Sequence, residues 1–304
     1  MWIRRRQANV VVTRESLDHQ QHRTHTLVRP SVVSPGAPLV LVLHEFRDTG
    51  ESMRSRYAGR SFDSFARDGG AVVAYPDDIA REWNSARKAV MLSRRIKRVN
   101  DVGYLRGLAE HLVTTWSLDP HRVFVVGFSL GGQMAIRLLC DAPDLLAGAA
   151  LISSTLPAAS NRVCSERPPM PVPVLTFHGT ADPLALWRGG TVGFRISPTQ
   201  QRALFGKGQH LSFPDTLRWF AARNGIETPP AFQWIPTGSG WVGRTEYHQP
   251  GHKPVTGYTV VGGKHEIPGP IGRSLLPDTT VGGGLVAAEV IAQFLGINGT
   301  NRHC

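Results

Sequence analysis

Six short apolar segments constrain most strongly how this 304-residue chain can fold. They cover residues 38–44, 70–76, 122–127, 147–153, 172–178 and 258–261. An apolar run that does not alternate with polar residues is typical of a strand buried on both faces, as in a parallel sheet covered by helices on two sides. The chain is therefore predicted to contain a mostly parallel central sheet.

Helical patterns lie between these segments, at residues 52–68, 101–116, 131–140, 214–224 and 285–295. In residues 101–116 the apolar side chains recur at intervals of three and four, which is typical of a helix packed on one side. Alternation of strands and helices predicts an α/β fold with helices on both faces of the sheet. Because no internal repeat or long linker interrupts the pattern, we expect one domain over residues 25–297.

The segments outside this alternation are predicted to be irregular. Residues 1–24 are polar and rich in Arg, His and Gln, which predicts a basic, mobile arm or at most one leading strand. Residues 298–304 form a predicted tail. Two stretches rich in Gly and Pro, residues 184–213 and 227–256, are expected to form loops over the functional face of the sheet.

The chain carries a formal net charge of +11 and has a sequence pI of about 10.3. Such a balance can indicate nucleic acid, an anionic surface or an acidic substrate. No nucleic-acid-binding motif is present, so a basic solvated surface is favoured and no nucleic-acid partner is expected. No apolar stretch approaches the ~18–20 residues of a membrane span. Polar residues follow the basic start and interrupt any signal-peptide core, so the cytoplasm is the default expectation.

Three cysteines, Cys140, Cys164 and Cys304, are too few for a disulfide scaffold. One bridge between Cys140 and Cys164 is compatible with their positions around the same predicted strand, and it would leave Cys304 free. Three unpaired thiols are also compatible with the sequence.

The segment Gly127-Phe128-Ser129-Leu130-Gly131 follows one predicted strand and precedes a predicted helix. A Gly-x-Ser-x-Gly turn in this context presents a serine as a nucleophile, because the strained turn exposes the hydroxyl and the glycines relieve crowding. A serine hydroxyl also needs a base, an acid that orients the base, and donors for the oxyanion.

Asp182 and His265 are the predicted acid and base. Asp182 follows a buried strand in a tight turn, although its alternative role is that of a turn residue before proline. His265 follows the last predicted strand, which completes the chain order Ser, Asp, His. His248, His252 and His303 lie in a polar loop or in the tail and fit this order less well.

The predicted oxyanion donors are backbone N–H groups. One belongs to Leu130, directly after the nucleophile, and the other to the loop at Glu45 or Phe46. Candidates for substrate binding share a place on predicted strand ends or nearby loops; they are His44, Trp83, Trp187, Trp241 and Ile267. Each of the tryptophans and Ile267 could equally be core or loop packing. No metal or nucleotide motif is present, so no metal site is predicted.

These segments resemble the polyhydroxybutyrate depolymerase and feruloyl esterase group of α/β-hydrolases, especially its bacterial lipoprotein-like esterases. The matching stretches are residues 38–44, 73–77 with 83–84, 101–104, 119–123, 127–132, 178–183, 219–225 and 262–269. The resemblance implies the α/β-hydrolase fold and a carboxylic ester hydrolase that forms an acyl-enzyme. It implies Ser129, Asp182 and His265 as the triad, no cofactor, and small, aromatic or polymeric esters as substrates.

The sequence departs from this group at three places. Glu45 stands where the group usually has glycine, and a carboxylate close to the oxyanion would oppose its formation. Residues 264–269 lack the tryptophan that usually follows the histidine. Ile226 replaces a cysteine, so one common disulfide is expected to be absent. Members of the group are often exported. Two alternatives remain beside the esterase: a weak or inactive relative that serves as a binding protein, and an amide or peptide hydrolase.

Overall fold

A computed structural model describes residues 9–19, 21–79, 81–89, 94–164, 169–191, 208–238, 240–269 and 284–297. Within these ranges, ten strands form one sheet in the order β1-β2-β4-β3-β5-β6-β7-β12-β11-β10. The six predicted strands are its parallel centre: β3 (Leu39–Leu43), β4 (Val72–Pro76), β5 (Val123–Phe128), β6 (Gly148–Ile152), β7 (Val174–Gly179) and β12 (Val255–Val260). The prediction of a mostly parallel central sheet is confirmed.

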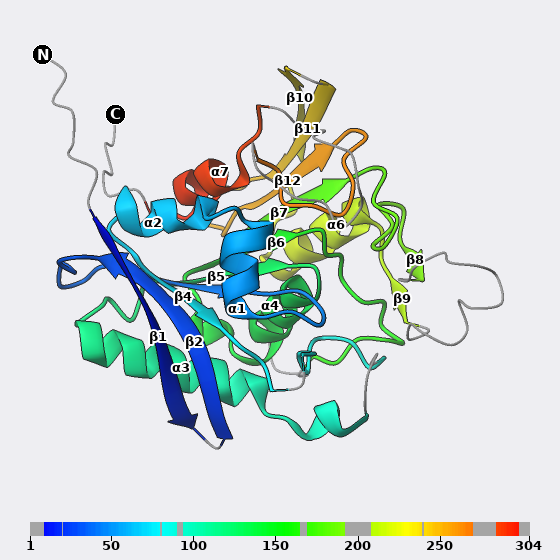
Figure 1. The fold of residues 1–304 in the computed structure, drawn as a ribbon. Coiled ribbons are helices and arrows are strands. Elements are labelled where there is room, and N and C mark those ends of the chain that lie inside the picture. The colour runs from blue at the N-terminus through cyan, green and yellow to red at the C-terminus, as the bar shows by residue number, and fades with distance from the viewer. Residues whose placement is uncertain are drawn as a thin grey trace, which may run out of the picture.

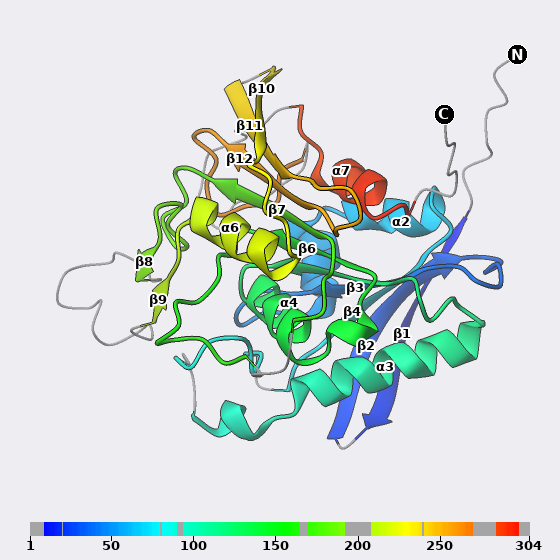
Figure 2. The same ribbon diagram turned by 180° about the vertical axis from the view of Figure 1, so that it is seen from behind.

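Helices cover both faces of the sheet (Figures 1 and 2). One face packs against α3 (Asp101–Trp116), α4 (Leu130–Asp141) and α6 (Phe213–Arg223), and the other against α7 (Ala287–Phe294) and the segment from α1 to α2. Successive side chains of a buried strand point to opposite faces of the sheet, so they pack alternately in the hydrophobic cores on its two sides. In β3, Leu41 packs on the α3 and α4 side, and Val42 packs on the α7 side.

The helix predicted over residues 52–68 is broken into four short pieces. They are α1 (Gly50–Ser52), the π-helical turn η1 (Met53–Tyr57), the 3₁₀ turn η2 (Ser61–Asp63) and α2 (Ser64–Arg67). Gly59 and Arg60, with φ of 53° and 62°, adopt left-handed backbone conformations between the second and third pieces. A left-handed residue reverses the local direction of the chain, so a continuous helix cannot pass through this point.

The prediction of a mobile arm or at most one leading strand over residues 1–24 needs correction, because residues 10–19 and 21–24 belong to a two-stranded hairpin. β1 (Val10–His19) and β2 (Gln21–Pro30) form an antiparallel hairpin, and β2 pairs with β4. Side chains from residues 11 to 17 alternate between half-buried and exposed, as expected of an edge strand with one covered face. The search for apolar runs missed this strand because its polar residues bond to neighbouring segments: Arg14 donates to Thr24 of β2 (2.9 Å) and to Asp77 after β4 (2.7 Å). The domain therefore begins before residue 25.

The prediction of a loop over residues 227–256 also needs correction. It contains β10 (Ala231–Thr237) and β11 (Gly240–Tyr247), an antiparallel hairpin that extends the sheet beyond β12. The remaining elements are η3 (Arg94–Arg98), η4 (Pro143–Leu145) and the two-stranded ribbon β8 (Gly190–Thr191) with β9 (Gln209–His210). Residues 1–8, 192–207 and 298–304 lie outside the described ranges, and the last of these segments includes Cys304.

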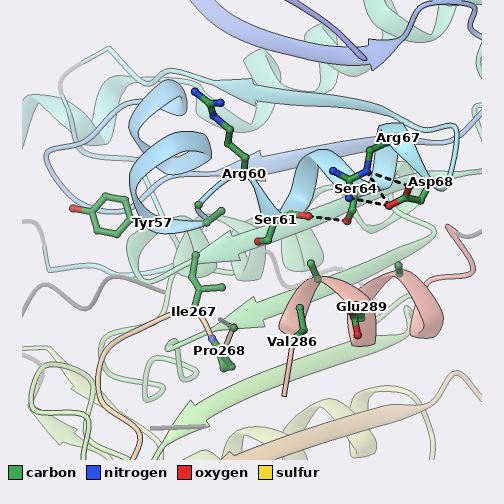
Figure 3. A pocket seen from close by; sticks show the side chains of 15 residues that line it. Tyr57, Arg60, Ser61, Ser64, Arg67, Asp68, Ile267, Pro268, Val286 and Glu289 are labelled. Atoms are coloured by element: carbon green, nitrogen blue, oxygen red, sulfur yellow. Dashed lines mark hydrogen bonds and ion pairs between the residues drawn. The ribbon is translucent and has the colours of Figure 1, made fainter. Parts of the chain in front are cut away.

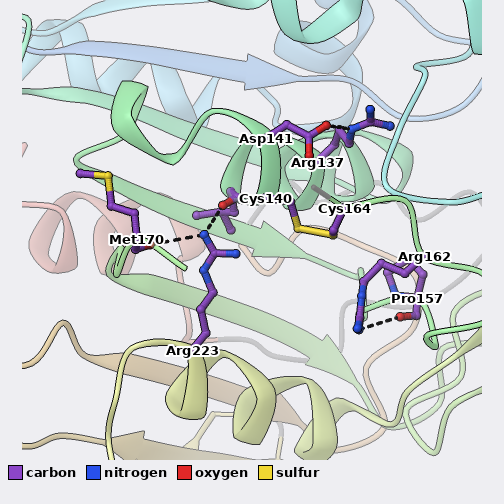
Figure 4. Close-up of a disulfide and its surroundings, with 9 residues drawn as sticks. Arg137, Cys140, Asp141, Pro157, Arg162, Cys164, Met170 and Arg223 are labelled. Atoms are coloured by element: carbon purple, nitrogen blue, oxygen red, sulfur yellow. Dashed lines mark hydrogen bonds and ion pairs between the residues drawn. A yellow bond between two sulfur atoms is a disulfide. The ribbon is translucent and has the colours of Figure 1, made fainter. Parts of the chain in front are cut away.

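A disulfide joins Cys140 at the end of α4 to Cys164 (Figure 4). Their Cα atoms lie 5.2 Å apart. Nearby, the guanidinium of Arg223 in α6 donates hydrogen bonds to the carbonyl oxygens of Leu139 and Met170, so α6 is tied to the end of α4. Among the described helices, none is long and apolar enough to cross a membrane.

Candidate active site

Ser129 occupies a sharp turn between β5 and α4. Its backbone is strained, with φ of 54° and ψ of −115°. Two hydrogen bonds hold this conformation: Ser129 N–H donates to the carbonyl of Ile152 (2.9 Å), and the Ser129 carbonyl accepts from Gln133 N–H (3.1 Å). The side chain is half-buried, so the hydroxyl stands at the carboxyl edge of the sheet rather than in the core.

Gly131 brings the start of α4 against the end of β3. A Cβ atom at this position would lie 2.1 Å from the carbonyl oxygen of Leu43 and 2.7 Å from that of His44. Only glycine permits this approach. The close contact places the N–H of Leu130, at the first turn of α4, beside the loop that carries Glu45 and Phe46. Within the described residues, the backbone N–H groups of Leu130 and Phe46 donate to no other backbone or side-chain group.

The structure brings Ser129, Asp182 and His265 together. Ser129 Oγ lies 2.7 Å from His265 Nε2, and His265 Nδ1 lies 2.7 Å from Asp182 Oδ2. Since a carboxylate only accepts hydrogen bonds, Nδ1 carries the proton and Nε2 can accept from the serine hydroxyl. The acid and base meet because they follow β7 and β12, which are parallel neighbours that end at the same edge.

Asp182 is held in place by its own turn. Its Oδ1 atom accepts hydrogen bonds from the N–H groups of Leu184 (2.8 Å) and Ala185 (2.9 Å), which leaves Oδ2 for His265. Burial would raise the pKa of this carboxyl group, but the charge and hydrogen bond of His265, together with its other partners, hold the pKa below its ordinary value. Asp182 is therefore ionised beside the imidazole at neutral pH.

His265 is almost fully buried, at 2% exposure. Burial lowers the pKa of its imidazole, but the charge and hydrogen bond of Asp182 outweigh burial, and Glu45 and Glu266 add to the effect. The pKa of His265 is therefore raised above its ordinary value. The imidazole is accordingly a stronger base toward the serine proton than an isolated histidine would be.

Glu45 points into the protein rather than toward solvent, with 5% of its surface exposed. The Tyr57 side chain is close to its carboxyl group, and Asp48 is close to Tyr57 in turn. Burial raises the pKa of Glu45, while the nearby His265 and Tyr57 oppose the rise. Glu45 replaces the glycine that is usual in the resembled group, and its carboxyl group is close enough to affect the pKa of the His265 imidazole.

Three of the substrate-binding candidates are buried: His44 and Trp83, whose burial contradicts direct contact with substrate in this arrangement, and Ile267. His44 is 0% exposed, and its Nδ1 atom donates to the Glu45 carbonyl (2.7 Å). Trp83 is 1% exposed and donates its indole N–H to the His44 carbonyl (3.0 Å). Both side chains hold the loop after β3 in shape. The sequence showed their places at strand ends, but not the packing that encloses them.

Of the remaining candidates, Trp187 is half-buried, Trp241 is exposed and Ile267 is 4% exposed. Trp187 packs against the core on the α6 side, and Trp241 lies on the β10–β11 hairpin. Ile267 lies with Tyr57 in the wall of a pocket of about 400 Å³ between the α2 segment and α7 (Figure 3). Ser129, Asp182 and His265 do not line this pocket.

Sequence reasoning missed Tyr57 and Gln133. Gln133 follows Ser129 by one helical turn, and its amide donates to Ser154 Oγ (2.6 Å) and the Thr155 carbonyl (2.7 Å), which fixes the strand end beside the nucleophile. Its position four residues after the serine, one turn into the predicted helix, could have indicated that it lies beside the nucleophile. Tyr57 had no such signal, because its approach to Glu45 depends on how the broken helix packs against the loop after β3.

A model of the phospholipase/carboxylesterase family matches residues 96–190, which include Ser129 and Asp182. A solved acetyl xylan esterase from Aspergillus awamori superposes with a TM-score of 0.62 over 94% of this chain and 99% of its own, at 13% identity. This chain has the α/β-hydrolase fold. The fold class expected from the resemblance is thus confirmed.

Curated relatives of this chain carry esterase and depolymerase names, as the resemblance implied. NocK of Nocardia uniformis subsp. tsuyamanensis, provisionally named an esterase, is 34% identical over 55% of this chain and 46% of its own. Feruloyl esterase B of Piromyces equi is 27% identical over 51% and 28%. Poly(3-hydroxyalkanoate) depolymerase C of Paucimonas lemoignei is 24% identical over 89% and 66%. This chain thus spans less than half of the length of each of the first two relatives.

Proposed function

We propose that this α/β-hydrolase is a serine carboxylic ester hydrolase in which Ser129, His265 and Asp182 act as the catalytic triad. The observation that carries the proposal is the pair of 2.7 Å contacts from the Ser129 hydroxyl to the imidazole and from the imidazole to the carboxylate. The esterase names among its relatives support the same activity.

The chemistry follows from this geometry. Ser129 Oγ attacks the ester carbonyl while its proton passes to His265 Nε2, and the imidazolium then protonates the departing alkoxide as the carbon–oxygen bond breaks. Water next gives a proton to Nε2 and attacks the acyl-enzyme, and that proton returns to Ser129 as the acid leaves. Asp182 keeps the imidazole in the required tautomer and stabilises its charge.

The developing oxyanion would bind between the N–H groups of Leu130 and the Glu45–Phe46 loop. The contact of Gly131 with the end of β3 supports this pairing because it sets the two segments side by side. Preorganised backbone donors of this kind are each worth about 3 kcal/mol of transition-state stabilisation. A carboxylate only accepts hydrogen bonds, so we assign the oxyanion contact to backbone donors and not to the buried Glu45 side chain.

Small or aromatic esters and polyester oligomers are the proposed substrates. The names feruloyl esterase and poly(3-hydroxyalkanoate) depolymerase among the relatives support this range.

Replacement of the nucleophile tests the proposal. Ser129→Ala should abolish turnover of p-nitrophenyl acetate and butyrate, with a loss of about 10⁴-fold or more in kcat. Ser55→Ala, which changes an exposed serine, is the matched control and should keep the parent rate. A fluorophosphonate probe should label the parent protein and not Ser129→Ala. A folded parent protein that never labels would instead favour a binding role, and unchanged turnover by Ser129→Ala would refute the assignment.

A further inference from the structure

Three aromatic side chains on the β10–β11 hairpin are more than half exposed. Phe232, Trp234 and Trp241 have exposures of 54%, 52% and 53%. Figures 1 and 2 show the hairpin projecting from the end of the sheet beyond β12. Large apolar side chains are costly to leave in water, so a group of them on one surface marks a binding site more often than a structural need.

The strand register places the three side chains on one face. Phe232 and Trp234 are two residues apart on β10, so they point the same way. Trp241 of β11 stands directly opposite Pro236, the next residue on that face. We call these three side chains the aromatic face of the hairpin.

Gly243 gives the rings room to lie across the hairpin. It stands opposite Trp234, and a Cβ atom there would come within 3.0 Å of the Phe232 ring and 3.3 Å of the Trp234 ring. The two rings pack edge to face, with centroids 5.0 Å apart. They therefore support each other on the surface and keep a fixed shape while they remain exposed.

The aromatic face is uncharged. The residues that share it by register are Phe232, Trp234, Pro236, Trp241, Gly243 and Thr245. The charged residues of the hairpin, Arg244 and Glu246, alternate to the opposite face and pair with each other at 2.7 Å. In a chain with 34 basic and 23 acidic residues, this neutral surface complements an uncharged occupant rather than a nucleic acid or an anionic lipid.

β10 is also the last strand of the sheet, and no described strand pairs with its outer edge. Its free N–H and C=O groups therefore run beside the aromatic rings as a row of donors and acceptors. A sugar chain offers apolar C–H faces for the rings and hydroxyl groups that donate and accept along this edge. A polyester chain offers carbonyl acceptors only, so it leaves the strand carbonyl groups without partners.

We infer that the aromatic face of the β10–β11 hairpin binds a neutral polysaccharide and brings esters attached to that chain to the hydrolase. The hairpin is joined to the segment that carries His265, because the Trp241 carbonyl accepts from Val261 N–H (3.1 Å), four residues before His265. The catalytic consequence rests on the proposed esterase function, whereas the binding does not.

Adsorption to insoluble polymers tests the inference separately from catalysis. The full chain is mixed with insoluble xylan, microcrystalline cellulose or polyhydroxybutyrate granules, and the protein left in solution is measured. We expect adsorption to at least one polysaccharide, weakened on the order of tenfold by Phe232→Ala/Trp234→Ala/Trp241→Ala. Trp234→Tyr should retain much of it. Val32→Ser, which removes another exposed apolar side chain at 82% exposure, should adsorb like the parent.

Each other outcome contradicts the inference. Equal adsorption by the parent and the triple variant would remove the aromatic face as its cause. Adsorption to polyhydroxybutyrate granules alone would identify a polyester surface instead, and no adsorption at all would leave no polymer site. A parent dimer that the triple variant loses in light-scattering measurements would identify a second copy of the chain as the occupant. Because adsorption needs no turnover, a failed esterase assay leaves this result interpretable.

Discussion

The candidate active site and the β10–β11 hairpin use aromatic and polar residues in opposite ways. Around Ser129 the acid and base are buried, and Asp182 accepts three hydrogen bonds. On the hairpin, three aromatic side chains are exposed and carry no comparable network. Where contacts are buried and mutual, a single change disturbs both geometry and stability; where side chains are exposed, a change affects only what binds there.

Among the substitutions that test this comparison, Asp182→Asn should have the largest effect, and the effect should be on kcat. An asparagine amide cannot stabilise the imidazolium and can reverse the tautomer of His265, so kcat on p-nitrophenyl acetate should fall by about 10⁴-fold. Circular dichroism should show that the variant stays folded. A fall smaller than tenfold would mean that the 2.7 Å contact between His265 and Asp182 is structural only.

Gly131→Ala tests whether the close approach of α4 to β3 is obligatory. The new Cβ would lie 2.1 Å from the Leu43 carbonyl oxygen, so the free energy of unfolding should fall by about 2–3 kcal/mol. Urea unfolding measures the change. Gly269→Ala is the control, since a Cβ there meets nothing within 4 Å and should change stability by less than about 0.5 kcal/mol. Equal losses in the two variants would argue against a special role for the Gly131 contact.

Glu45→Gln should shift the pH dependence of the active site. The Glu45 charge is one cause of the raised pKa of His265, and Asp182 is the larger one. Because the base works only when neutral, activity falls as pH drops through this pKa. Removing the Glu45 charge lowers the pKa, so the acidic limb of kcat/KM should move to lower pH. Profiles of parent and variant on p-nitrophenyl butyrate measure the shift, and a move to higher pH would contradict the assignment.

The hairpin should show the smallest effects on stability. The triple alanine variant of Phe232, Trp234 and Trp241 should change the free energy of unfolding by less than about 1 kcal/mol, because these side chains are mostly exposed. Val242→Ala is the matched comparison on the same hairpin. Val242 is fully buried on the opposite face, and its truncation should cost about 1–3 kcal/mol. A larger loss in the aromatic variant would show that the rings support the fold.

Local patterns predicted the centre of the sheet and three members of the site. The apolar runs became the six central parallel strands, and residues 101–116 form α3 as expected. Ser129, Asp182 and His265 were found because a strand-end position and chain order are visible along the sequence. Their catalytic role stays a prediction that the substitutions above test.

The outermost strands β1 and β10 were not predicted as part of the sheet, since an edge strand needs only one covered face. β1 and β10 therefore contain polar or exposed residues where the apolar-run criterion expects a buried segment. The break between η1 and η2, where Gly59 and Arg60 adopt left-handed backbones, was not predicted, and Arg60 is a residue with no special turn preference. The disulfide between Cys140 and Cys164 was one of two possibilities until their separation was known.

The sequence by itself determined the α/β class, the order of the central strands along the chain, and the three residues that meet at the sheet edge. These properties depend on local periodicity and on which residue follows which strand. Only the tertiary structure decided that His44, Trp83 and Glu45 are enclosed and that Phe232, Trp234 and Trp241 are exposed. Burial depends on which distant segment packs over a side chain, and a single position in the sequence does not carry that information.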